Sequence, residues 1–158
     1  MVLMMEIRQI LETDEKQIVS SQILNALPQW FGIPESVQEY VRSSSGMPFW
    51  AAFESERPIG FLARKKTGDA AAEVYVMGVL PEYHRKGVGR ELYAALENDA
   101  RQHGIRYLQV KTVKMGCYPF YDKTNRFYQS MGFSELECFP QLWDVWNPCQ
   151  IYVKYIGG

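Results

Sequence analysis

The stretch EYHRKGVGREL, residues Glu82–Leu92, decides how the whole sequence is interpreted. A histidine and two cations lead into Gly87-Val88-Gly89, where a helical pattern starts. Glycines inside a regular element are destabilising, so a local requirement must favour two of them here. One explanation is a tight turn between a strand and a helix. The other is a phosphate cradle, because the amino end of a helix presents about four unpaired N–H groups and the positive end of its dipole.

The segments on both sides of this stretch form a strand–helix–strand unit. A β-prone run at Ala72–Leu80 comes first. The segment Gly87–His103 follows with apolar residues at four-residue spacing, which predicts a helix, and Arg106–Val113 is the next predicted strand. Two strands joined through a helix are expected to be parallel, with a right-handed crossover.

The other predicted elements complete a mixed α/β pattern. Thr13-Asp14 is expected to cap the first helix, and the predicted hairpins are expected to be antiparallel. The strands are predicted at Met4–Ile10, Phe49–Glu54, Ile59–Lys65, Phe133–Phe139 and Gln150–Ile156, and the helices at Thr13–Leu27, Glu35–Ser43 and Tyr121–Met131. The fold class is therefore α/β (α+β), a central mixed β-sheet flanked by helices. The length predicts a single domain over residues 1–158.

Composition argues against several classes of partner. The formal net charge is −1, so no global basic field points to nucleic acid. No apolar run approaches the roughly 20 residues that cross a bilayer, so no membrane partner is predicted. The three cysteines, Cys117, Cys138 and Cys149, show no metal-binding spacing. They indicate free thiols in a reducing cytoplasm and no metal cofactor.

Two familiar phosphate-binding motifs do not fit the opening stretch. A Walker A loop needs GxxxxGK followed by Ser or Thr, and the sequence has none. A dinucleotide-binding fingerprint needs a third glycine directly after the first strand, whereas here Leu92 stands at that position, in the middle of the chain.

A third pattern does fit. The residues Val79-Leu80-Pro81-Glu82-Tyr83-His84-Arg85-Lys86-Gly87-Val88-Gly89 resemble the acetyl-CoA motif V-x-P-x-x-Q/R-x-x-G-x-G/A of the GCN5-related N-acetyltransferase (GNAT) family. Arg126-Phe127-Tyr128-Gln129-Ser130-Met131-Gly132-Phe133 resembles the family's later motif, in which a helix carries Tyr and ends at Gly-Phe. The spacing of the two motifs and the element order match across nearly the whole chain. The resemblance implies a GNAT-type acyl-CoA N-acyltransferase fold and an acetyltransferase that uses acetyl-CoA.

The sequence departs from the family pattern at three positions. His84 stands where the family usually has Gln or Arg, and its ring can still donate to a phosphate. Tyr121 and Thr124 stand where many relatives have Asn and Ala, and Asn125 is off register. The amide contact to the pantetheine arm therefore has no counterpart in register.

The resemblance implies a set of cofactor-binding residues on the strand and at the helix entrance. Backbone N–H groups from Arg85 to Arg90 are expected to matter most. Gly78 is expected at a bulge that opens a gap for the pantetheine arm, although a packing glycine is the alternative. The full set is Met77, Val79, His84, Arg85, Lys86, Gly87, Val88, Gly89 and Arg90.

Two residues are predicted to carry the proton transfers. When an amine attacks a thioester, the leaving thiolate needs a proton, and a phenol within reach can supply it. The resemblance gives this role to Tyr128, which would otherwise be a core aromatic. The amine must lose a proton, and Glu73 is the candidate base acting through water, with an exposed strand-end acid as the alternative.

The acceptor side is predicted from its aromatic residues. Trp30, Trp143 and Asp144 are expected to bind a cationic amine, with a dimer interface and the core as alternatives for the tryptophans. The predicted acceptor is a primary amine of a small molecule, and a homodimer is a family-level expectation. Two alternatives stay open for the activity: a CoA-binding regulatory module without turnover, and transfer of a different acyl group.

Overall fold

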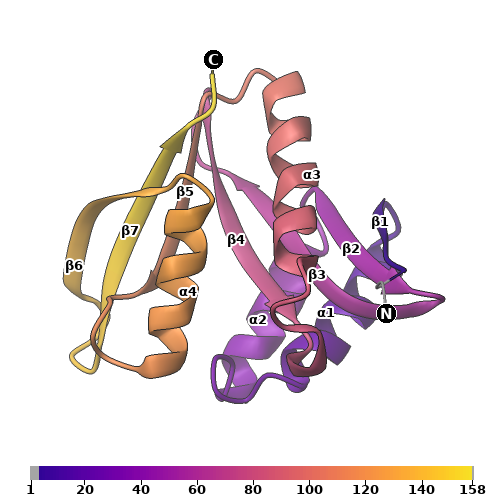
Figure 1. The fold of residues 1–158 in the computed structure, drawn as a ribbon, viewed down its shortest axis with the longest axis horizontal. Coiled ribbons are helices and arrows are strands. Elements are labelled where there is room, and N and C mark those ends of the chain that lie inside the picture. The colour runs from indigo at the N-terminus through magenta and orange to yellow at the C-terminus, as the bar shows by residue number, and fades with distance from the viewer. Residues whose placement is uncertain (1–3, 158) are drawn as a thin grey trace. The chain divides into compact units, whose positions relative to one another are not determined.

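The computed structural model describes residues 4–157 and contains one seven-stranded sheet with the order β1-β2-β3-β4-β5-β7-β6. Figure 1 shows the fold as a ribbon, coloured from the N-terminus to the C-terminus. The elements are β1 (Glu6–Gln9), α1 (Thr13–Asn25), α2 (Pro34–Ser44), β2 (Phe49–Glu54), β3 (Arg57–Lys66), β4 (Ala71–Val79), the 3-10 turn η1 (Pro81–Tyr83), α3 (Val88–Gln102), β5 (Tyr107–Val113), α4 (Pro119–Ser130), β6 (Ser134–Asp144) and β7 (Asn147–Tyr155). The predicted mixed sheet is confirmed.

The chain divides into two compact units. The first unit holds residues 1–65 and 74–103, and the second holds residues 66–73 and 104–158. Strand β4 contributes Ala71–Glu73 to the second unit and Val74–Val79 to the first. The expectation of one domain over residues 1–158 stays a prediction.

In the first unit, β1 pairs antiparallel with β2 and β2 with β3, and the hairpin of β2 and β3 is as predicted. Phe49 and Phe61 stack with their ring centroids 5.2 Å apart in the core of this unit. Helix α3 lies in front of these strands in Figure 1, and α1 and α2 lie behind them. Gly60 lets α3 approach closely, because a Cβ atom there would lie 3.2 Å from side-chain atoms of Val88 and Leu92.

Gly78 likewise allows helix α1 and the residues after it to approach the sheet closely. A Cβ atom at Gly78 would lie 2.9 Å from Leu27 Cδ1 and 3.0 Å from Ile23 Cγ2, which is closer than packed side chains allow. This contact supports the packing alternative for Gly78. The predicted bulge stays a prediction, because the pairs recorded between β4 and β5 end at Glu73↔Gln109.

In the second unit, the first three residues of β4 pair parallel with β5, from Ala71↔Tyr107 to Glu73↔Gln109. The predicted parallel pairing is confirmed for this part. Strand β7 lies antiparallel between β5 and β6, and α4 packs against β5. Strand β6 is an edge strand whose residues are almost all exposed.

The hairpin of β6 and β7 differs from the prediction. The sequence predicted strands ending at Phe139 and starting at Gln150, with an aromatic loop between them, whereas β6 continues to Asp144 and β7 begins at Asn147. The loop prediction was wrong for two reasons. The Asp144 side chain closes a tight turn, and a register shift between Phe139 and Asp144 accommodates Pro140 on an edge strand, where its missing N–H is tolerated.

Two helix starts also differ. Thr13 is the first helical residue of α1, the N-cap position is Glu12, and no side chain caps the helix, so the capping role of Thr13-Asp14 was wrong. Helix α4 begins at Pro119, two residues before the predicted start. A proline fits there because its fixed φ suits the first turn and its missing N–H would have no partner in the helix. Across residues 4–157, no helix is both long enough and apolar enough to cross a membrane.

Candidate active site

The connection from β4 to α3 has an unusual backbone. Arg85 has a φ of 64°, and Gly87, the N-cap residue of α3, has a φ of 82°. Left-handed conformations are uncommon outside glycine and concentrate at functional sites. Left-handed residues before a helix are typical of turns whose backbone N–H groups can converge on an anion.

Two side-chain hydrogen bonds hold this connection in place. The buried Tyr83 donates its hydroxyl to Glu54 Oε1 at 2.5 Å. The His84 ring nitrogen Nε2 donates to the carbonyl oxygen of Val79 at 2.7 Å, so this nitrogen carries the proton. Donation from His84 to a phosphate would therefore fall to its other ring nitrogen, Nδ1. The two side-chain bonds fix the loop without using its backbone N–H groups.

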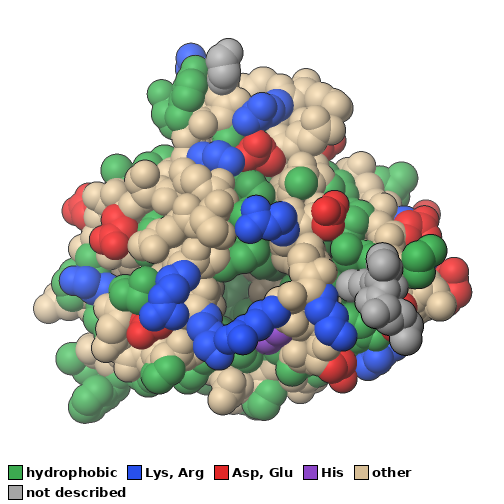
Figure 2. Space-filling view, in the orientation of Figure 1, with side chains coloured by type: hydrophobic (Ala, Val, Ile, Leu, Met, Phe, Trp, Pro, Cys, Tyr) green, Lys and Arg blue, Asp and Glu red, His purple; other side chains and the backbone are tan. Residues whose placement is uncertain are grey.

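The start of α3 adds further donors and charge. The first backbone bond of the helix runs from Glu91 N to Gly87 O, so Val88, Gly89 and Arg90 precede the point where the helix supplies acceptors. The side chains of Arg85, Lys86 and Arg90 are exposed. Figure 2 shows Lys and Arg side chains beside a histidine on the face where this connection lies. The arrangement can bind a phosphate or a pyrophosphate.

Trp30 lies next to this connection. Its ring meets the His84 ring edge-on, with the centroids 5.8 Å apart. A residue predicted for the acceptor and a residue predicted for the cofactor are thus in contact within the first unit.

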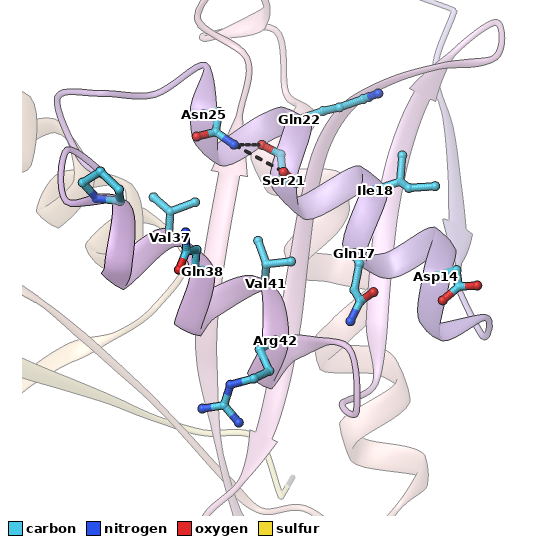
Figure 3. A pocket seen from close by; sticks show the side chains of 11 residues that line it. Asp14, Gln17, Ile18, Ser21, Gln22, Asn25, Val37, Gln38, Val41 and Arg42 are labelled. Carbon is cyan, nitrogen blue, oxygen red and sulfur yellow. Dashed lines mark hydrogen bonds between the residues drawn. The ribbon is translucent and has the colours of Figure 1, made fainter.

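A separate hollow of about 1100 Å³ lies in the first unit between α1 and α2. Figure 3 shows its lining, in which Asn25 Nδ2 donates to the backbone oxygen of Ser21 at 2.8 Å. The lining is Asp14, Gln17, Ile18, Ser21, Gln22, Asn25, Pro34, Val37, Gln38, Val41 and Arg42. It includes none of the residues predicted for the site.

The second unit brings Tyr128 and Glu73 together. Tyr128 is 5% exposed, and burial raises the pKa of its phenol, with the Glu73 carboxylate raising this pKa further. The phenol therefore keeps its proton over the whole physiological pH range. A protonated phenol beside a carboxylate can act as a proton donor.

Glu73 is not an exposed strand-end acid, because only 5% of its surface is accessible. Lys111 of β5 lies with its Nζ 3.7 Å from Glu73 Oε2. Lys111 was missed at the sequence level. Lys111 lies on the strand that was predicted to run parallel to the strand of Glu73. Neighbouring parallel strands bring side chains on the same face close together, and this could have indicated the pair.

Asn125 has a structural role in α4. It is fully buried, and its Nδ2 donates to Val113 O at 2.8 Å and to Tyr121 O at 2.7 Å. Its Oδ1 accepts from the Tyr152 hydroxyl at 2.6 Å. These bonds tie the helix to the end of β5 and to β7. The amide is therefore engaged within the protein, in agreement with its position off the family register.

Trp143 and Asp144 belong to the second unit, whereas Trp30 belongs to the first. Trp143 is 44% exposed. Asp144 Oδ1 accepts from the backbone N–H of Trp146 at 2.9 Å, and both carboxylate oxygens accept from Asn147 Nδ2. The Asp144 carboxylate thus stabilises the hairpin turn. A substrate amine that bound Asp144 would compete with these hydrogen bonds.

None of the three cysteines forms a disulfide. Cys117, Cys138 and Cys149 are all free thiols. Burial raises the pKa of Cys149 from its ordinary value of 9.0 to about 11. Within residues 4–157, no group of three His, Cys, Asp or Glu side chains is placed to hold a metal ion.

The class of protein is shown by a family match that covers the elements from β1 to α4 and, among them, the connection before α3. The model of the family described as "Acetyltransferase (GNAT) family" matches residues 6–133, which is most of the chain. The protein belongs to the GNAT acetyltransferase family, as the resemblance predicted.

Individual relatives are distant. The uncharacterized N-acetyltransferase YsnE of Bacillus subtilis (strain 168) is 26% identical over 91 residues, which is 58% of this chain and 58% of that protein. The match thus spans less than two thirds of that relative's length.

Two solved structures share the fold. A GNAT-family protein of Desulfovibrio desulfuricans is 22% identical, with a TM-score of 0.83 over 97% of this chain and 99% of its own. An aminoglycoside 6'-N-acetyltransferase, solved with coenzyme A, is 16% identical, with a TM-score of 0.79 over 96% of this chain and 97% of its own. The predicted GNAT-type fold is confirmed.

Proposed function

We propose that the protein transfers an acetyl group from acetyl-CoA directly to a primary amine of a small molecule. The observation that carries the proposal is the connection between β4 and α3, where Arg85 and Gly87 take left-handed conformations directly before the helix. Membership of the GNAT family supports the same reaction class.

The cofactor assignment is supported by the chemistry of this connection. Pyrophosphate oxygens need several donors at close range, and the turn offers backbone N–H groups from Arg85 to Arg90. A Cβ atom at Gly87 would meet no atom within 4 Å, so this side of the turn is open to a ligand. Arg85, Lys86 and Arg90 add positive charge. In the proposal, Met77, Val79 and His84 complete the cofactor-binding set, and no metal is needed.

The reaction needs two proton movements. The amine nitrogen forms a bond to the thioester carbonyl carbon, the carbon–sulfur bond breaks, and the sulfur leaves as a thiolate. We assign Tyr128 as the donor that protonates this thiolate and Glu73 as the base that takes the amine proton through water. The burial of both side chains supports these roles, because a buried phenol and a buried carboxylate exchange protons with few competing waters.

A small amine is the proposed acceptor. The half-buried Trp30 ring against His84 offers an aromatic wall for a compact cation. The exposed tryptophans of the β6–β7 hairpin suit either an acceptor or a second copy of the chain, so the homodimer also stays a prediction. The aminoglycoside acetyltransferase that shares the fold acts on a small amine, which is consistent with this choice.

The deciding experiment is calorimetric titration with acetyl-CoA. The test variant is Gly89→Asp, which places bulk and negative charge at the entrance of α3. The matched control is Gly46→Asp, which adds the same charge in the exposed connection between α2 and β2, where a Cβ atom has room. We expect micromolar binding to the wild type and to Gly46→Asp, and none to Gly89→Asp.

A wild type that does not bind acetyl-CoA at any salt concentration would overturn the cofactor assignment. If binding holds, thiol release is measured with amino acids, polyamines, aminoglycosides and lysine peptides as acceptors. Turnover only with peptides would contradict the small-molecule part. Tight binding of acetyl-CoA without turnover on any amine would favour a CoA-binding regulatory module. Faster turnover with a longer acyl-CoA would show that the protein transfers an acyl group other than acetyl.

A further inference from the structure

The buried carboxylate of Glu73 and the partly exposed ammonium of Lys111 form an ion pair within the second unit. Glu73 pairs directly with Gln109 across the parallel strands β4 and β5. Lys111 lies two residues further along β5, on the same face of the strand as Gln109, because side chains alternate. Its Nζ is 3.7 Å from Glu73 Oε2, while the side chains are 34% and 6% exposed.

The two partners differ in what burial costs them. A buried carboxylate is unfavourable unless it is paired or bonded. The Lys111 ammonium keeps part of its hydration because a third of its side chain reaches solvent. Lys111 can therefore supply a positive charge to the buried carboxylate at little cost to itself.

Two titratable groups recorded beside Glu73 stay neutral. The Tyr128 phenol of α4 stays protonated because burial raises its pKa. The Cys149 thiol of β7 stays protonated for the same reason, and it interacts with both Glu73 and Lys111. The Lys111 ammonium lies within 4.0 Å of the Glu73 carboxylate, with its Nζ 3.7 Å from Oε2.

We propose that Lys111 is a positioning residue that holds Glu73 as an ionised, oriented carboxylate, so that it is ready to take a proton at neutral pH. This inference rests on the proposed function, in which Glu73 is the base. Lys111 itself exchanges no proton with the substrate. Its ammonium acts on Glu73 by attraction across the 3.7 Å contact.

The test compares three variants in two measurements. Lys111→Met removes the charge and keeps the length of the side chain, Lys111→Arg keeps the charge, and Lys114→Met removes a neighbouring exposed lysine as a control. The first measurement is kcat/KM with acetyl-CoA and an accepted amine from pH 5 to 9. The second is carbon-13 NMR titration of the Glu73 carboxyl in the protein without substrate, assigned with Glu73→Gln.

We expect the acidic limb of the pH profile to move upward by about one pH unit or more in Lys111→Met, as losing a close opposite charge predicts. At a pH below both midpoints the rate should then fall about tenfold, and it should recover as the pH rises. The NMR midpoint of Glu73 should move by a similar amount. Lys111→Arg and Lys114→Met should keep the wild-type midpoints.

An unchanged acidic limb, or an NMR midpoint that does not move in Lys111→Met, would overturn the proposal. If Lys111→Met does not fold, Lys111→Gln takes its place in both measurements. Failure of the proposed function would give a different result, because the wild type would then acetylate no amine. The NMR titration would still show whether Lys111 controls the ionisation of Glu73.

Discussion

The cradle before α3 and the cluster around α4 are built in opposite ways. In the cradle, the backbone faces outward, the loop side chains Arg85 and Lys86 are exposed, and the shape comes from two left-handed residues. In the cluster, the side chains Tyr128, Glu73 and Asn125 are buried, and they define the shape themselves. A site made of backbone should tolerate side-chain changes that leave its φ angles intact, and a site made of side chains should not.

The largest effect is expected in the cluster. Tyr128→Phe removes one hydroxyl and keeps the ring, which packs edge-on against Phe133 with centroids 5.7 Å apart. Steady-state kinetics should show kcat falling by about a hundredfold or more, the range for loss of a general acid. Acetyl-CoA affinity and the urea midpoint should stay near the wild-type values. A kcat within threefold of the wild type would remove Tyr128 from the chemistry.

Asn125→Leu should give the next largest effect, on stability. The change leaves the carbonyl oxygen of Val113 without its Asn125 donor and the Tyr152 O–H without its acceptor, although the Tyr152 oxygen keeps its bond from Gln129 Nε2. A buried group left without its partner costs about 1–3 kcal/mol, so urea unfolding should show a loss of about 2–5 kcal/mol. Tyr152→Phe leaves Asn125 Oδ1 without its donor and keeps both bonds from Asn125 Nδ2, so it should lose about 1–2 kcal/mol. Equal losses in the two variants would show that the amide does not hold α4.

Gly87→Ala tests the cradle through its backbone. The added methyl meets no atom within 4 Å, so any effect comes from the φ of 82°. An L-residue in this conformation costs about 1–2 kcal/mol. Thermal or urea unfolding should show this loss, and calorimetry should show weaker binding of acetyl-CoA. Gly68→Ala, where no positive φ is present, is the control and should be neutral. Unchanged binding and stability in Gly87→Ala would argue against a cradle that depends on this conformation.

Arg85→Gly should have a smaller effect, and in the opposite direction for stability. Arg85 has a φ of 64°, which glycine adopts freely. If backbone groups bind the phosphates, the affinity for acetyl-CoA should stay within about tenfold of the wild type, since an exposed charge contributes up to about 1 kcal/mol. The measurement is calorimetry at two salt concentrations. A loss of all binding would show that the guanidinium, and not the backbone, carries the site.

The last prediction concerns how the stability contribution of Cys149 depends on pH. The folded-state pKa of about 11 lies above the ordinary value of 9.0. The contribution of this thiol to stability is therefore complete below pH 9 and is lost as the pH rises toward 11. Cys149→Ala should be less stable at pH 7 because it leaves a small cavity. The stability gap to the wild type should narrow between pH 9 and 10.5 in urea titrations, and a constant gap would contradict this assignment.

The same contrast explains what the sequence could predict. The cradle is local, because its residues lie within Glu82–Leu92 and its glycines and cations can be recognised by spacing alone. The cluster depends on partners far apart in sequence, such as Asn125 with Tyr152 and Glu73 with Lys111. No periodicity reports such pairs. The sequence therefore predicted roles for Tyr128 and Glu73 mainly through a family resemblance, and the pair of Glu73 with Lys111 was not predicted.

The hairpin was missed for a different reason. Pro140 and the closely spaced aromatics of residues 139–146 suggested a loop, because proline interrupts a central strand. An edge strand follows different rules, since its outward N–H groups need no partner strand. The position of β6 at the edge of the sheet is a property of the topology, which local sequence does not contain.

Strand β4 changes unit in its middle, between Glu73 and Val74. Neither unit is therefore one continuous segment, and no single cut of the chain yields two complete units. A cut after His103 would leave the fragment 104–158 lacking only residues 66–73 of its own unit, and the fragment 1–103 would carry them. The two fragments are thus suited to complementation, in which a strand segment donated by one completes the other.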